Sequence, residues 1–166
     1  MIEAPEGYEP ERVVFDGGTS EDRERLLRLY YDFRLANDGL DNEALRPLWS
    51  ADPGCVFFNT NGHAYHGIDD WLHIWDHYRT RLELMRPGGS GTIRVTVRGD
   101  MALVTDDRVG RYWRWIGRAE RPDFLAEKPY IRATLVCVRD GGAWRAIHGH
   151  FSSGRPGKRP DQGGPE

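Results

Sequence analysis

The chain has 166 residues, of which 39% are hydrophobic and 30% charged, and its formal net charge is −3. These values fit one globular domain with an apolar core. The small negative charge gives no reason to expect a nucleic-acid partner, and no run of about 20 apolar residues suggests a membrane span.

The first segment, residues 1–18, has no hydrophobic period and contains two prolines and a Gly-Gly pair. We expect an extended arm here that can pack on a neighbour. Its acidic start lacks the pattern of a signal peptide. Cys55 and Cys137 lie in apolar runs, which favours reduced core thiols and a cytoplasmic location.

Two helices are expected next. Thr19, with Asp22 three residues later, is typical of a capping box, and it predicts a helix over 20–37. Residues 41–49 predict a second, short helix, although Pro47 is unfavourable inside it and an irregular turn is the alternative.

Short strands are predicted at 55–61 and 64–66, followed by a third helix over 68–85 and a Pro-Gly loop at 87–91. Residues 117–129 are expected to form a charged loop within a set of four longer strands. The predicted long strands are 92–98, 101–116, 130–139 and 143–153.

This order separates the helices from a mostly antiparallel sheet, so the fold class is α+β. A sheet of four long strands must curl to cover three helices, which predicts a cone-shaped curved antiparallel sheet with a pocket at its open end. The predicted organisation is an arm at 1–18, a cone domain at 19–153 and a disordered tail at 154–166.

Three local motifs in this order carry a family resemblance. They are LWSAD at 48–52 with CVF at 55–57, YHGIDDW at 65–71, and DGGAWRAIHGHFS at 140–152. Over residues 20–153 the chain resembles the nuclear transport factor 2-like superfamily, particularly its SnoaL-like members, which have a cystatin-like roll. The last motif is also similar to the association domain of calcium/calmodulin-dependent protein kinase II.

The resemblance implies several function classes, because this fold hosts dehydratases, isomerases, polyketide cyclase-like enzymes and non-catalytic assembly modules. Ketosteroid isomerases carry one acid on the penultimate strand and another at the end of the first strand. The corresponding positions here fall near Thr134 and near Phe58 or Asn59, and none of these residues is a carboxylate. A steroid-isomerase mechanism is therefore not favoured.

His148 and His150 stand at i and i+2, so on a strand they project from the same face. The resemblance puts Ile147 and Phe151 on the pocket face, which turns both histidines outward, toward the usual dimer surface of the superfamily. A β-bulge near Gly149 would instead turn them inward. An interface or buried network and a catalytic pair both remain open.

Metal binding is the third possibility, because the sequence holds three close histidine pairs. They are His63 with His66, His73 with His77, and His148 with His150. The apolar stripe of the third helix leaves His73 and His77 on the opposite, solvated face. We therefore expect no bound metal, and a histidine-ligated metal enzyme stays an alternative.

The favoured interpretation is a small-molecule-binding domain that forms a homodimer. If it is an enzyme, we expect a lyase, isomerase or cyclase that uses acid/base chemistry without a cofactor on a hydrophobic oxygenated substrate. The rival is a non-catalytic association module. In the enzyme, His66 would be the base and Arg132 would stabilise oxyanion charge, unless His66 is structural and Arg132 is a solvated partner of an aspartate. The full candidate set is His66, Asn59, Arg132, His148 and His150 for catalysis, and Tyr30, Tyr65, Tyr112, Thr134 and Phe151 for substrate binding.

Overall fold

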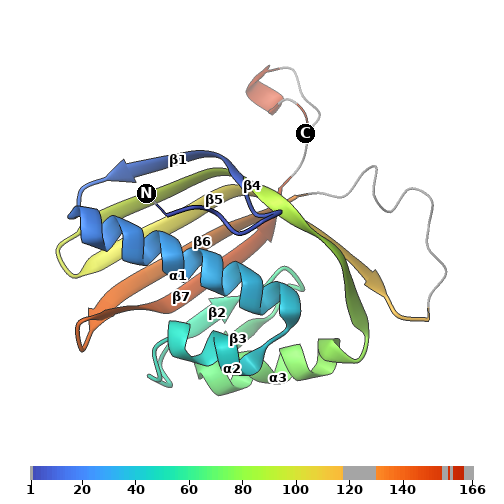
Figure 1. Ribbon diagram of the computed structural model, residues 1–166. Coiled ribbons are helices and arrows are strands. Elements are labelled where there is room, and N and C mark those ends of the chain that lie inside the picture. Colours follow the sequence, from blue (N-terminus) through green and yellow to red (C-terminus); the bar gives the residue numbers. More distant parts are fainter. Residues whose placement is uncertain (1, 118–129, 155–156, 158, 163–166) are drawn as a thin grey trace.

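The computed structural model describes residues 2–117, 130–154, 157 and 159–162, with side chains for all of these except Arg111 and Tyr112. Within them, seven strands form one sheet in the order β1-β4-β5-β6-β7-β2-β3. The long helix α1 lies across one face of this sheet, and the shorter helices lie beside its C-terminal end (Figure 1). The elements are β1 (Pro10–Asp16), α1 (Ser20–Gly39), α2 (Asn42–Leu45), a 3-10 turn (Arg46–Leu48), β2 (Val56–Phe58), β3 (Ala64–His66), α3 (Gly67–Arg79), β4 (Leu82–Arg98), β5 (Met101–Trp115), β6 (Ile131–Asp140), β7 (Ala143–Ser153) and a 3-10 turn (Pro160–Gln162).

Helix α1 begins with the capping box that the sequence predicts. The Thr19 hydroxyl accepts the Asp22 backbone N–H at 3.1 Å, and the Asp22 carboxylate accepts the Thr19 backbone N–H at 3.2 Å. The helix ends before Leu40, which adopts a left-handed conformation with φ of 50°. Its buried residues include Leu26 and Phe33, which belong to the core between helix and sheet.

Strand residues alternate between two faces. On β5 and β6, Val104 and Leu135 are completely buried against the helices and define the inner face of the sheet. Leu103 and Thr134, one residue away on the same strands, lie on the opposite, outer face, where Leu103 is 38% exposed. The inner face therefore builds the core, and the outer face lies away from α1.

The curl of the sheet comes from breaks in strand register. The β4–β5 pairing shifts between Leu84 and Arg86 and again between Pro87 and Ser90. A Cβ atom on Gly88 would lie only 2.4 Å from the carbonyl carbon of Gly110, so the two strands approach closely only because both residues are glycine. The prediction of a loop at 87–91 is therefore wrong, because this stretch is the bulged middle of β4.

The N-terminal arm is part of the same sheet. Strand β1 pairs in parallel with β4, from Pro10 opposite Ser90 to Asp16 opposite Thr96. The arm thus packs on its own chain, as an edge strand of the sheet. Because β2 and β7 are also parallel, the sheet is mixed, which corrects the expected antiparallel sheet while the α+β cone is confirmed.

The smaller differences have local causes. The predicted helix 41–49 is a single turn followed by a 3-10 turn that contains Pro47 near its start. Helix α3 ends at Arg79, so the chain enters β4 earlier than predicted. The predicted loop 117–129 and disordered tail 154–166 lie mostly outside the described residues. No helix of the described chain is long and apolar enough to span a bilayer.

Candidate functional site

A cavity of about 710 Å³ lies between the C-terminal end of α1, helix α3 and the curved ends of β4 and β5. Cavities of this size hold drug-sized ligands. Aromatic side chains supply much of its wall, so an apolar ring system fits it best. The aromatic lining residues are Trp71, Trp75, Tyr78, Trp113, Trp115, Tyr130 and Phe151.

The aromatic wall continues into the core. Phe151 stacks on Phe33 with ring centroids 5.5 Å apart and on Trp71 at 5.6 Å. Tyr65 meets the Trp71 ring edge-on at 5.3 Å from behind the cavity. The indole N–H of Trp71 is buried with no hydrogen-bond partner among the described residues. Phe151 and Trp71 therefore pack against each other and against further rings behind the wall.

Polar groups enter this wall at a few points. Asn59 lines the cavity from the turn after β2, and its side-chain oxygen accepts the Thr60 backbone N–H at 2.7 Å. Asn37 lines it from α1 and is 6% exposed. Ser90 lines it from the bulge of β4 and is 4% exposed. Such isolated polar groups orient a ligand in an otherwise apolar pocket.

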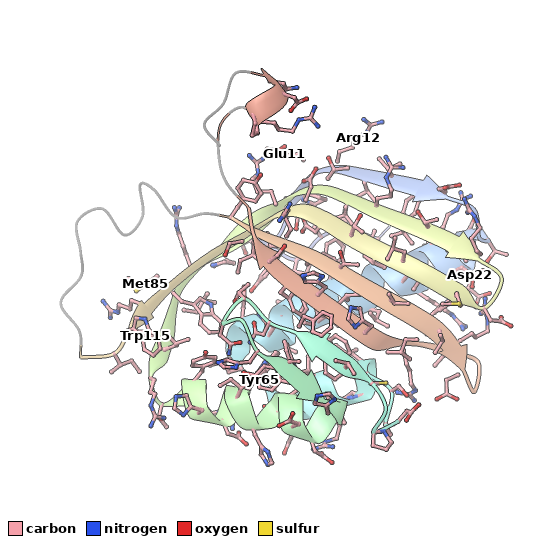
Figure 2. All side chains as sticks on the ribbon, turned by 180° about the vertical axis from the view of Figure 1, so that it is seen from behind. Glu11, Arg12, Asp22, Tyr65, Met85 and Trp115 are labelled. Atoms are coloured by element: carbon pink, nitrogen blue, oxygen red, sulfur yellow. The ribbon has the colours of Figure 1, made fainter. Side chains whose placement is uncertain are left out.

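Charged side chains lie at the rim, and the arm supplies two of them. Glu9 and Glu11 both line the cavity, and Glu11 pairs with Arg108 from β5. Figure 2 places Glu11 on the arm strand. The backbone oxygen of Glu9 accepts the Ser90 N–H at 3.1 Å, so the backbones of these two residues are adjacent. The Oε1 atom of Glu9 accepts the Gly7 N–H at 3.0 Å.

A buried arginine lies directly behind the same wall. Arg34, on α1, donates from Nη1 to the Ser90 hydroxyl at 2.8 Å, and Nη1 lies 3.6 Å from Asp106 Oδ2. Its Nη2 donates to the backbone oxygens of Gly88 at 2.6 Å and Gly110 at 3.1 Å. The guanidinium group therefore ties the bulged part of β4 to β5, and Asp106 compensates its charge.

Tyr30 completes this network one helical turn before Arg34. Its hydroxyl donates to Asp106 Oδ2 at 2.7 Å, and the backbone N–H of Arg108 donates to Oδ1 at 3.0 Å. Burial, followed by the negative charge of Asp106, holds the pKa of Tyr30 well above its usual range. Tyr30 therefore stays protonated and serves as a hydrogen-bond donor to Asp106.

The structure brings two of the sequence candidates to the cavity. Asn59 and Phe151 line it, as proposed. Tyr30 is buried behind it, and Tyr65 supports Trp71 without lining it. The side chain of Tyr112 lies outside the described residues.

Arg132 and Thr134 are not pocket residues, which corrects the prediction. Ala133 and Leu135 are the buried residues of β6, so their neighbours Arg132 and Thr134 lie on the outer face. Arg132 is exposed, and its guanidinium donates to the Ser153 carbonyl at 3.4 Å. It cannot stabilise charge on a ligand in the cavity.

The two histidines of β7 also lie on the outer face. A bulge at Ile147 shifts the β6–β7 register, and Gly149 and Phe151 beyond it are buried. The ring of His148 contacts the Val56 carbonyl through Nδ1 at 2.6 Å, and His150 is exposed. The outward alternative is therefore confirmed, and neither histidine is a catalytic group of this cavity.

The remaining histidine candidate, His66, does not line the cavity either. It is exposed at the start of α3, where its backbone N–H donates to Asp70 at 2.8 Å. His73 and His77 are exposed, as expected. Among the described residues, no group of three or more His, Cys, Asp or Glu side chains is placed to hold a metal ion.

Sequence reasoning missed the residues that join the buried network to the cavity. Arg34 follows Tyr30 by four positions on the buried stripe of α1, which was a usable signal. Asp106 alternates with the apolar residues Ala102 and Val104, which also predicts an inward side chain. Ser90 lies in a glycine-rich run that carries no such period.

The comparisons with known proteins agree with this architecture. Residues 27–156 match the family model of the SnoaL-like domain, so the chain belongs to the SnoaL-like domain family. None of the curated proteins compared with the chain matched it.

Three solved structures illustrate the shared fold. A candidate calcium/calmodulin-dependent kinase II association domain from Exiguobacterium sibiricum is 17% identical, with a TM-score of 0.64 over 85% of this chain and 99% of that one. A candidate dehydratase from Streptomyces avermitilis is 21% identical, with a TM-score of 0.57 over 80% and 96%. A candidate ketosteroid isomerase from Shewanella frigidimarina is 15% identical, with a TM-score of 0.52 over 75% and 92%. At these identities the likeness concerns the fold alone.

Proposed function

We propose that this chain binds a hydrophobic, ring-containing, oxygenated small molecule in the aromatic cavity. The observation that carries this proposal is the composition of the wall, in which tryptophan rings surround a few separate polar groups. Within it, we propose Asn59 as a hydrogen-bonding group at the reacting part of the ligand and Phe151 as an apolar substrate contact. Because Arg132 lies outside, the ligand need not be an anion.

A pair of substitutions on one strand tests the binding site. Ile131 and Arg132 are adjacent on β6, and Ile131 lines the cavity whereas Arg132 does not. Ile131→Trp should fill part of the cavity and weaken binding of the probe 2-acetylnaphthalene by about tenfold or more. Arg132→Trp adds the same ring on the outer face and should leave the affinity unchanged. Equal affinities for wild type and both variants would contradict the site.

We further propose cofactor-independent acid/base chemistry, with Glu9 as the proton carrier. No described histidine lines the cavity, and of the two lining carboxylates Glu11 is already paired with Arg108. Glu9 is exposed, so it can exchange its proton with solvent. In an isomerisation, dehydration or cyclisation it would take a proton from carbon next to a carbonyl, whose oxygen then carries the charge.

Hydrogen exchange on the same probe tests this chemistry. The methyl hydrogens of 2-acetylnaphthalene exchange with D2O when a base removes one and a deuteron replaces it, which mass spectrometry follows. The wild type should accelerate the exchange, and Glu9→Gln should remove most of the acceleration, about 100-fold. Glu6→Gln, an exposed arm residue outside the lining, is the control. Equal acceleration by Glu9→Gln and wild type would exclude Glu9 as the base.

The second candidate function is an association module, and the outer face favours it. Phe58 is 43% exposed there and Leu103 38% exposed, and the Phe58 ring meets both His148 and His150 edge-on. Apolar side chains gathered on a sheet face favour contact with a partner. We propose that two copies of the chain bury this face in a homodimer.

Light scattering tests this assembly. The wild type should show twice the 19.0 kDa chain mass, and Leu103→Glu should return it to the monomer mass. Leu35→Glu is the matched control, because Leu35 is 43% exposed on α1, away from the outer face. A monomeric wild type at micromolar concentration would contradict the dimer without affecting the cavity.

A further inference from the structure

The hydroxyl oxygen of Ser90 accepts one hydrogen bond, and its own hydrogen atom is left to donate a second. Arg34 donates to its oxygen at 2.8 Å, and no residue that the structure describes accepts its hydrogen. Ser90 is 4% exposed, and the surface that it presents lines the cavity. A hydroxyl whose oxygen accepts a bond from a cation becomes a stronger donor through its remaining hydrogen.

The orientation of this hydroxyl is fixed from behind. Arg34 is 1% exposed and holds both β4 and β5 through the Gly88 and Gly110 carbonyls. The Arg34 guanidinium also lies over the Tyr8 ring, with its central carbon 5.1 Å from the ring centroid. Asp106 balances its charge at 3.6 Å. The donor is therefore preorganised, since none of these groups needs to move when a ligand arrives.

We propose that Ser90, held by Arg34, is the point at which the cavity recognises an oxygen atom of its ligand, a carbonyl or a similar hydrogen-bond acceptor. The inference rests on the proposed small-molecule function and names the oxygen-binding position within it. The backbone of Glu9 is bonded to that of Ser90, and Glu9 lines the same cavity. A carbonyl bound at Ser90 would have a donor for the charge on its oxygen, in a cavity that a carboxylate also lines.

Arg34 has a simpler role that needs no ligand, because it also stabilises the bulge. A measurement of stability alone therefore decides nothing, and a comparison of two ligands is needed. The probes 2-acetylnaphthalene and 2-ethylnaphthalene have almost the same shape and differ by the carbonyl oxygen. The ratio of their affinities reports the hydrogen bond, whereas a general loosening of the cavity weakens both together.

The experiment is equilibrium dialysis of both probes with the wild type, Ser90→Ala and Thr134→Ala. In Ser90→Ala the preference for the acetyl probe should fall by about tenfold, while the ethyl probe binds as before. Thr134→Ala removes a hydroxyl from the outer face of the sheet, away from the cavity, and should leave the preference unchanged.

The outcomes separate the two proposals. An unchanged preference in Ser90→Ala would overturn the role of Ser90 even if both probes bind well. If Ser90→Ala does not fold, Ser90→Cys decides, because a thiol fills the same space but is a weaker donor and must also lower the preference. Failure of the wild type to bind either probe would contradict the proposed function, and this position with it.

Discussion

Two polar networks lie at opposite ends of the sheet, and they differ in their access to water. At one end Asp22 accepts from Arg139 Nη2 at 2.7 Å and from the Trp144 indole at 3.2 Å, and the Arg139 side chain is 31% exposed. Figure 2 shows Asp22 at the end far from Trp115, a residue of the cavity. At the cavity end the side chains of Arg34 and Asp106 are 1% and 0% exposed.

The two networks also differ in their relation to the cavity. Neither Asp22 nor Arg139 lines it, and we call their network the closed one; Ser90 does line it, and we call the Arg34 network the open one. Asp22 also caps α1 through Thr19, so its contacts fasten the helix to the last hairpin and present nothing to a ligand. The cavity network is more deeply buried, yet its member Ser90 lines the cavity. A buried charge pair whose contacts end at a cavity suits recognition, because its geometry is fixed and its local dielectric is low.

The largest expected effect is the loss of the buried carboxylate. Asp106→Asn leaves the Arg34 cation without compensation in the interior, which should reduce the free energy of unfolding by about 3–5 kcal/mol. Asp107→Asn, at the exposed next position, should change it by less than about 0.5 kcal/mol. Urea denaturation of both variants measures the difference. Equal midpoints would mean that Asp106 does not balance Arg34.

A comparison of the two adjacent tyrosines of α1 isolates a single hydrogen bond, and its expected effect on stability is smaller. Tyr30 and Tyr31 are 0% and 2% exposed, but only Tyr30 donates to Asp106. Tyr30→Phe should lower the free energy of unfolding by about 1.5–3 kcal/mol, because it removes a bond to a charged acceptor. Tyr31→Phe should be close to neutral. A larger loss in Tyr31→Phe would contradict the hydrogen-bond assignment.

The smallest effect belongs to the closed network and depends on pH. Bonds from Arg139, then those from Thr19, hold the pKa of Asp22 below its ordinary value of 3.8. A lowered pKa stabilises the fold above pH 3.8, and this contribution is lost as the pH falls toward the native pKa. Asp22→Asn should lower Tm by a few degrees at neutral pH, and the gap should narrow below pH 3.8.

Asp32 is the control for the sign of this effect. Burial raises the pKa of Asp32, so its charge opposes folding above that pKa. Asp32→Asn should therefore leave Tm unchanged or slightly higher at neutral pH, and the difference should vanish in acid. A loss of Tm in Asp32→Asn equal to that in Asp22→Asn would contradict the assigned pKa directions.

The fold was predictable because its signals are local. The Thr19 capping box fixes the start of α1 through contacts between near neighbours in the sequence. The bulge at Gly88 was not predictable, since glycine favours loops and only the facing Gly110 makes a strand possible there. That pairing is a contact between residues far apart in the sequence.

The site was less predictable, for the same physical reason. Both faces of β6 carry apolar or β-branched residues, so alternation alone did not decide whether Arg132 faces the cavity or the outside. Arg34 is an arginine inside the core, where that residue type is rare without partners. Its partners Ser90 and Asp106 come from other strands and become visible only in three dimensions.

The parallel strand β1 has a practical consequence for any shortened form of the chain. Cutting at residue 18, where the sequence suggests a domain boundary, would expose the long strand β4 as a free edge. Unprotected edges pair with other chains and aggregate. The cut would also strip Glu9 and Glu11 from the cavity rim. The segment from Glu9 to Asp16 thus protects the edge of the sheet and forms part of the cavity rim.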